Sequence, residues 1–214
     1  MKILNTIVII LLISISSCTI TQEFNFNKNF SGNTRLAIDM GSLMEMMSGM
    51  DSSGVKTQDM KDSLDFVFQE SKVKLDSLGI KNIKYGWEEG TNILFMSYDF
   101  DNIETLNKSL NASSQGSAFG KTLSSEPHTY FTLKGKELSY KGPKSSNDVS
   151  NNADMESMKD YYKYVLIFNF TRTIKKTDNP KFILSPDNKR AELNGSMFEI
   201  IRPEFNSDIK FKLK

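Results

Sequence analysis

This sequence of 214 residues is poor in the residues that build disulfide frameworks and metal centres. It contains a single Cys and a single His. One Cys cannot form an intramolecular disulfide, and one His cannot supply a multi-histidine metal site. The chain must therefore fold on its apolar core, and its length suffices, because a domain of this size buries roughly 70% of its unfolded surface.

The chain also lacks an excess of either charge. It has 27 basic and 26 acidic residues, a formal net charge of +1, which argues against nucleic acid as a partner. The sequence contains no glycine-rich phosphate-binding motif, no Gly-x-Ser-x-Gly elbow and no EF-hand spacing. We therefore predict no cofactor, no metal site and no catalytic residues.

The N-terminus carries an export pattern. Lys2 precedes an apolar run over residues 3–13, which ends in the small-residue segment Ile15-Ser16-Ser17-Cys18. This is the layout of a secretory signal peptide, and the run is shorter than the ~20 residues of a membrane span. The alternative is a secretory signal that ends beside an incidental Cys.

Ile15-Ser16-Ser17-Cys18 resembles the lipobox of bacterial lipoproteins. The resemblance implies that Cys18 receives a diacylglycerol, becomes the mature N-terminus and holds the protein to a membrane through acyl chains such as palmitate. Loss of residues 1–17 leaves 26 basic and 26 acidic residues, so attraction to anionic lipids would add little. We expect a cell-envelope lipoprotein, anchored in the outer membrane and facing the periplasm.

The expected domain organisation has three parts: a signal peptide (1–17), a short lipidated tether (18–22) and one domain (23–214). Apolar residues alternate in two runs that predict a hairpin over residues 23–40. Helical spacing predicts helices over 42–50 and 58–78, the second ending at Gly79. A short helix is expected over 102–110, before a long loop at 111–127, and a second loop over 142–154. We also expect strands over residues 80–85, 92–100, 130–133, 137–140, 160–174, 182–184, 191–193 and 209–213.

These elements indicate an α+β fold: a mainly antiparallel, curved sheet with the two longer predicted helices packed on one face. Lysines on the open face of the terminal strand, 209–213, are expected to deter edge-to-edge pairing.

Two groups of proteins share parts of this layout. Gly79-Ile80-Lys81-Asn82-Ile83 and the segment Phe-Asp-Asn-Ile-Glu-Thr-Leu-Asn at 100–107 resemble uncharacterised small lipoproteins of Bacteroidetes. The strand-to-helix passage at 91–110 and the late long strand are distantly similar to the LppM-type lipoprotein domain. That second resemblance implies a curved sheet with helices and lipid-related binding, and it transfers no functional residue.

A methionine cluster is the richest group of possible ligands. Thioethers can bind Cu(I) or form an adaptable apolar surface, but at helical spacing they usually pack into the core. We expect core packing and no copper binding. The cluster consists of Met40, Met44, Met46, Met47 and Met50.

Other candidates are weighed in the same way. His128 could act as a general base towards Ser124 or Ser125, but a strand-end role is the simpler interpretation. The acidic pairs sit in a predicted turn and at a strand end, where one of the second pair would cap the next helix. These pairs are Glu88-Glu89 and Asp99/Asp101.

The remaining candidates are aromatic and basic. The rings could be core, rim or ligand platform, and sheet packing is the simpler explanation; they belong to Trp87, Tyr161, Tyr162 and Tyr164. The basic pairs, Lys175-Lys176 and Lys189-Arg190, look scattered and form no stripe.

We therefore predict a non-enzymatic binding or scaffolding module whose ligand is a lipid, an envelope polymer or a protein. The alternative is a periplasmic hydrolase with an unrecognised site. An apolar cavity between helix 58–78 and the sheet would favour lipid binding, and a flush-packed interior would favour protein contacts.

Overall fold

The structure is a computed structural model, and it describes residues 18–48, 57–116, 127–143, 161–196, 199 and 205–214. The helices are α2 (Gly41–Ser48), α3 (Thr57–Ser77) and α4 (Ile103–Gly116). The strands are β1 (Cys18–Phe26), β2 (Gly32–Asp39), β3 (Lys81–Trp87), β4 (Ile93–Phe100), β5 (Phe131–Lys134), β6 (Glu137–Tyr140), β7 (Tyr162–Phe170), β8 (Ile174–Thr177), β9 (Ile183–Leu184), β10 (Arg190–Ser196) and β11 (Ile209–Leu213).

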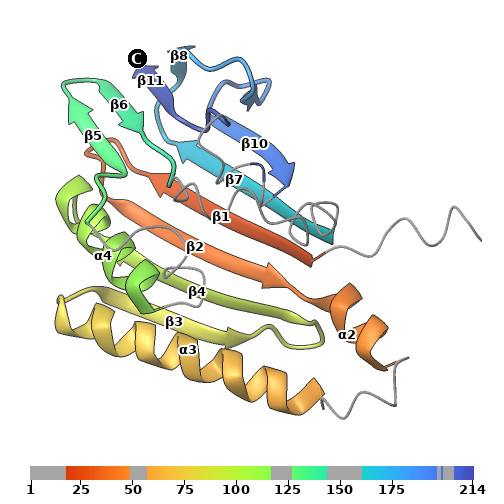
Figure 1. The fold of residues 1–214 in the computed structure, drawn as a ribbon. Coiled ribbons are helices and arrows are strands. Elements are labelled where there is room, and N and C mark those ends of the chain that lie inside the picture. Colours follow the sequence, from red (N-terminus) through yellow and green to blue (C-terminus); the bar gives the residue numbers. More distant parts are fainter. Residues whose placement is uncertain (1–17, 49–56, 117–126, 144–160, 197–198, 200–204) are drawn as a thin grey trace, which may run out of the picture.

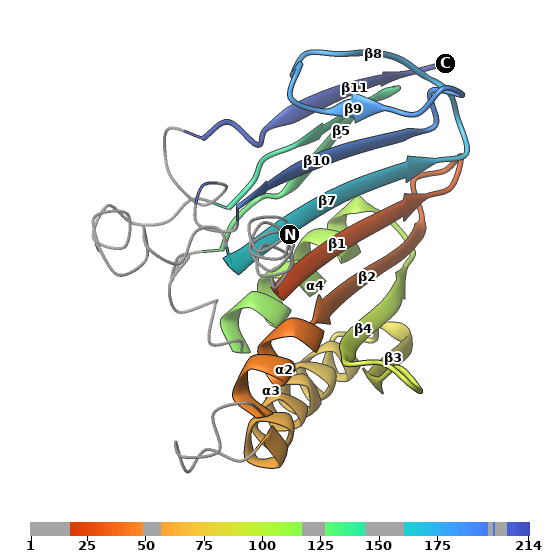
Figure 2. The same cartoon turned by 90° about the vertical axis from the view of Figure 1, so that its right-hand side faces the viewer.

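The strands form two sheets. The larger has seven strands in the order β3-β4-β2-β1-β7-β10-β9, and the smaller has four in the order β5-β6-β11-β8. The β1–β7 pairing is parallel, and every other pairing is antiparallel. The helices and the small sheet lie on one side of the large, twisted sheet (Figures 1 and 2). The predicted α+β class is therefore confirmed.

The predicted hairpin over 23–40 is formed by β1 and β2, and its register follows the apolar alternation. Phe24 lies opposite Thr34, and Phe26 lies opposite Gly32. At the turn, Asn27 N–H donates to Ser31 O over 2.8 Å. Asn29 Oδ1 accepts from the Ser31 hydroxyl over 2.8 Å. The turn therefore satisfies its own polar groups without help from distant residues.

Two apolar clusters share the inner face of the large sheet. The first fills the space between the two sheets and is mostly aromatic, with Phe24, Phe131 and Phe168 at its centre. The second lies between the large sheet and helices α2 and α3. Tyr164 packs against both clusters, so the two form one continuous layer along the sheet.

Helix α3 matches the prediction for residues 58–78 closely. Phe68 and Leu75 belong to the same apolar cluster as Leu94 and Met96 of β4, and Leu75 is fully buried. The helix ends at Gly79, whose φ of 72° is the left-handed conformation that a C-terminal glycine supplies. Side chains thus pack in this contact between the helix and the sheet. This is the arrangement that we expect to favour protein contacts over lipid binding. No helix among the described residues combines the length and apolar character needed to cross a bilayer.

Three predictions about elements are wrong. Helix α4 extends to Gly116 rather than 110, because Asn107 and Asn111 continue it while bonding to Phe131 O and His128 O. Its N-terminal cap is Asn102, whose Oδ1 accepts from Thr105 N–H over 2.9 Å, so neither Asp99 nor Asp101 has that role. The terminal strand 209–213 is not the edge strand that its lysines predict, because β11 pairs with β6 on one side and with β8 on the other. Its apolar residues, Ile209, Phe211 and Leu213, are buried.

Candidate functional site

Cys18 is the first residue of β1 and lies in the sheet. It pairs with Tyr162 of β7, and the next residue, Thr19, pairs with Asp39 of β2. Its side chain is 7% exposed and belongs to the second apolar cluster, together with Ile20. The sulfur of the predicted lipidation site is therefore part of the folded core.

The predicted tether at 18–22 is wrong as a description of this segment. Residues 18–22 are strand, hydrogen-bonded to β2 on one side and to β7 on the other. Cys18, Ile20 and Phe24 are all buried on the same face, so the alternation starts before residue 23. The signal in the sequence for this earlier start of the strand is the alternation of Cys18 and Ile20 with polar residues. The predicted signal peptide, 1–17, lies outside the described residues.

Burial also sets the chemistry of this thiol. Burial, reinforced by the negative charge of Asp39, raises the pKa of Cys18 from 9.0 to about 11. The group is thus almost fully protonated at neutral pH. Because the thiolate is the nucleophile, we expect Cys18 to react slowly in the folded domain.

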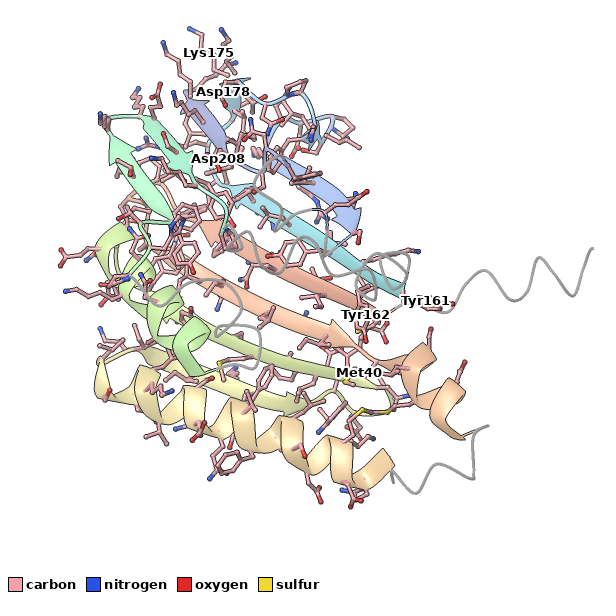
Figure 3. All side chains as sticks on the ribbon, viewed as in Figure 1. Met40, Tyr161, Tyr162, Lys175, Asp178 and Asp208 are labelled. Atoms are coloured by element: carbon pink, nitrogen blue, oxygen red, sulfur yellow. The ribbon has the colours of Figure 1, made fainter. Side chains whose placement is uncertain are left out.

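Several apolar and aromatic groups surround this end of the sheet, which we call the cysteine end: Cys18, Met40, Tyr161, Tyr162 and helix α2. Figure 3 shows Met40 beside the start of α2, and Tyr161 and Tyr162 at the start of β7. Tyr161 is 52% exposed. Tyr162 is half-buried, and burial together with the neighbouring Cys18 raises its pKa.

The methionine cluster divides at the limit of what the structure describes. Met40 and Met44 are buried members of the second apolar cluster, as the core interpretation predicts. The side chains of Met46 and Met47, and all of Met50, lie outside the described residues. Within the described part of the chain, no three metal-binding side chains of His, Cys, Asp or Glu gather.

Beside the cysteine end, a hollow of about 350 Å³ opens between the start of β7 and the end of β10. Tyr164 forms part of its wall, and its partner across the strands is Gly195, which carries no side chain there. Tyr164 is otherwise deep in the fold, and burial raises the pKa of its hydroxyl. The hollow is also lined by Lys163, Val165, Asn194, Ser196 and Glu199.

His128 is held by backbone contacts. Its Nε2 lies 3.1 Å from Lys141 O, and because a carbonyl only accepts, this nitrogen carries the proton. Its ring meets Tyr130 edge-on with the centroids 4.6 Å apart. These contacts join the start of β5 to the end of β6. The proposed partners Ser124 and Ser125 lie outside the described residues.

The acidic pairs do not form a dyad. Glu88 pairs with Arg35, and its neighbour Glu89 is exposed. Asp99 accepts from Asn33 and Asn82, whereas Asp101 pairs with Lys81 at 3.2 Å. Glu88, Asp99 and Asp101 thus each have their own structural partner.

The aromatic residues singled out in the sequence have distinct roles. Trp87 donates from Nε1 to Asp65 Oδ1 over 3.0 Å, and Lys61 Nζ lies 4.7 Å from its ring centroid. This half-buried ring therefore fastens α3 to β3. Of the other three, Tyr162 and Tyr164 are partly buried and pack against the apolar clusters, and Tyr161 is exposed.

No protein-family model and no curated protein matches this chain. Among solved structures, it is similar to the NMR structure of the folded domain of LppM from Mycobacterium tuberculosis. The TM-score is 0.45 and the identity is 9%, over 93% of this chain and 90% of that chain. An LppM domain is thus a structural neighbour, as the sequence resemblance led us to expect, and no functional assignment is based on it.

Proposed function

We propose that this protein is a lipoprotein of the cell envelope, acting as a non-enzymatic binding or scaffolding module. Residues 1–17 would direct export, and Cys18 would carry the acyl chains that hold the domain to the outer membrane, facing the periplasm. The observation that carries the proposal is the position of Cys18: it ends the export pattern and opens the first strand of the fold.

The order of events follows from the thiol's environment. With a pKa of about 11 and 7% exposure, Cys18 is a poor nucleophile once β1 has packed. Transfer of a diacylglyceryl group to the sulfur must therefore precede folding, while the N-terminal segment is still extended. Export in an unfolded state provides that interval.

The absence of a spacer determines how the domain would meet the membrane. Cys18 already pairs with Tyr162 of β7, and the next residue, Thr19, pairs with Asp39 of β2, so the acyl chains would leave directly from the sheet. The cysteine end, with exposed Tyr161 and helix α2, would then lie at the bilayer surface, where a Tyr ring with an apolar body and a polar tip is favourable. Two or three acyl chains give stable anchoring, whereas one alone is reversible.

A non-enzymatic role is supported by what the candidate catalytic groups do. The His128 ring is bonded to Lys141 O, and the carboxylates of Glu88, Asp99 and Asp101 each hold a structural partner. Side chains also fill the contact between α3 and the sheet, which favours a protein or polymer partner over a lipid held inside the fold.

The anchor is tested by metabolic labelling with an alkyne-bearing palmitate, followed by mass spectrometry of the N-terminal peptide. The chain and Ser17→Ala, which keeps a small residue before the Cys, should both incorporate label, begin at Cys18 and fractionate with the outer membrane. Cys18→Ala should incorporate none. An unmodified thiol in the exported protein, or label retained by Cys18→Ala, would refute the anchor.

A further inference from the structure

Lysines that are scattered along the sequence gather at one end of the four-stranded sheet. We call this group the lysine end: Lys134, Lys136, Lys175, Lys176, Lys212 and Lys214. All six side chains are exposed. They come from β5, β8, β11, the turn between β5 and β6 and the residue after β11, so three separate parts of the chain supply them. The sequence-based interpretation of Lys175-Lys176 as a scattered pair is wrong, because strand pairing brings Lys176 beside Lys212 of β11.

The strand register fixes their positions. Lys212 lies between Glu137 of β6 and Lys176 of β8, and Glu137 also lies opposite Lys134 of β5. At ~4.8 Å per strand, this row spans roughly 14 Å. Lys136 and Lys214 lie at the strand tips, where Leu213 N–H donates to Lys136 O and Lys214 N–H donates to Thr173 O. Lys175 directly precedes Lys176 in β8.

These charges are not neutralised within the described part of the chain. None of the six lysines forms an ion pair there, whereas the neighbouring Lys210 lies 4.0 Å from Asp178. Glu137 is the one acidic side chain in the row. Since basic and acidic residues are balanced over residues 18–214, this concentration makes the molecule electrically asymmetric.

The lysine end lies far from Cys18. Strands β1 and β7 run parallel from Cys18 and Tyr162 to Phe26 and Phe170, which is roughly 27 Å at ~3.3 Å per residue. Thr171 N–H donates to Phe26 O, so the chain leading to β8 starts at that opposite edge. Figure 3 shows Lys175 well separated from Tyr162.

We propose that the lysine end binds a flexible linear polyanion, a polymer with repeated phosphate or carboxylate groups. Lysines are mobile point charges, suited to an extended row of anions. That the polymer would be met on the aqueous side, and not at the anchoring bilayer, rests on the proposed function, in which Cys18 faces the membrane.

The test is the affinity of the full chain carrying Cys18→Ala for polyphosphate and for poly-L-glutamate, measured by calorimetry across a salt series. If all six lysines contact the polymer, the logarithm of the association constant should fall linearly with the logarithm of the salt concentration. The magnitude of the slope should be about 4 to 5. The triple variant Lys176→Gln/Lys212→Gln/Lys214→Gln should lower the slope to about 2 to 3 and weaken binding at least about tenfold at low salt.

The matched control is Lys74→Gln/Lys84→Gln/Lys108→Gln, on α3, β3 and α4, which changes the net charge equally. This control should leave the affinity for the polymer within about twofold of that of the parent chain. Thermal melting curves would establish that both triple variants fold. Binding of either polymer or both supports the proposal, and the preferred one identifies the anionic group. It is overturned by equal losses in the two triples, by no binding of either polymer, by equally tight binding of inorganic phosphate, or by binding only to vesicles of anionic phospholipid. Because no acyl chain is present, such a result leaves the anchor untouched.

Discussion

Phe24 and Phe168 stack face to face across the parallel pair β1–β7, with ring centroids 5.5 Å apart and planes 15° apart. Phe168 also contacts the rings of Tyr140 and Phe211, at 5.1 and 5.0 Å, which belong to the small sheet. A single side chain thus connects the strand that begins at Cys18 with the sheet that carries the lysine end. Both proposed surfaces depend on this aromatic junction for their relative positions.

Phe168→Ala should therefore be severely destabilising. Phe168 is completely buried, and its removal leaves a cavity that five neighbouring rings cannot close. We expect a loss of about 3–5 kcal/mol in the free energy of unfolding, measured by urea denaturation. Phe66→Ala, at a ring that is 61% exposed on α3, should change stability by no more than about 0.5 kcal/mol. Similar losses in the two variants would contradict the assigned core.

Gly32, at the start of β2, is predicted to tolerate no side chain. An added Cβ would lie 1.8 Å from Asn25 O and 2.9 Å from the Phe100 ring, and the first of these is backbone that cannot swing away. Gly32→Ala should cost about 1–3 kcal/mol, the usual range for overpacking. The comparison variant is Gly41→Ala, where the nearest atom is 3.3 Å away and belongs to the Asp39 side chain. Equal thermal stability of the two variants would be incompatible with the described hairpin.

The only Trp of the chain reports on the docking of α3. Asp65→Leu removes the acceptor for Trp87 Nε1–H and should cost about 0.5–1.5 kcal/mol, because the half-buried ring can regain part of this bond from water. In Asp65→Leu, the fluorescence emission of Trp87 should differ from that of the wild type in the native state and match it in urea. Asp65→Asn keeps a carbonyl acceptor and should give the smaller change. An unchanged native spectrum in Asp65→Leu would show that the contact does not form.

Local patterns explain which features could be predicted from the sequence. The hairpin at 23–40 and the helix at 58–78 depend on apolar spacing within one segment, and both are present. The parallel pairing of Cys18 with Tyr162 joins residues 144 positions apart, and no local pattern encodes it. The same holds for the inner position of β11, whose lysines look like edge protection until β6 and β8 pair on either side. The export pattern ends at Cys18, whereas the strand alternation that includes Cys18 and Ile20 starts there, so one residue belongs to both patterns.

The pH dependence of the unacylated protein provides the sharpest test of the buried thiol. The pKa of Cys18 is raised from 9.0 to about 11 in the folded state, so folding favours the neutral form. The thiol's contribution to stability is thus fully present below pH 9 and is lost as the pH rises from 9 to 11. Iodoacetamide should alkylate the native chain at pH 8 far more slowly than the urea-unfolded chain. In stability measurements, the difference between wild type and Cys18→Ala isolates this group from Tyr98, whose pKa burial raises to about 12. Equal alkylation rates in the native and unfolded chains would place the sulfur outside the core, and acylation would then not have to precede folding.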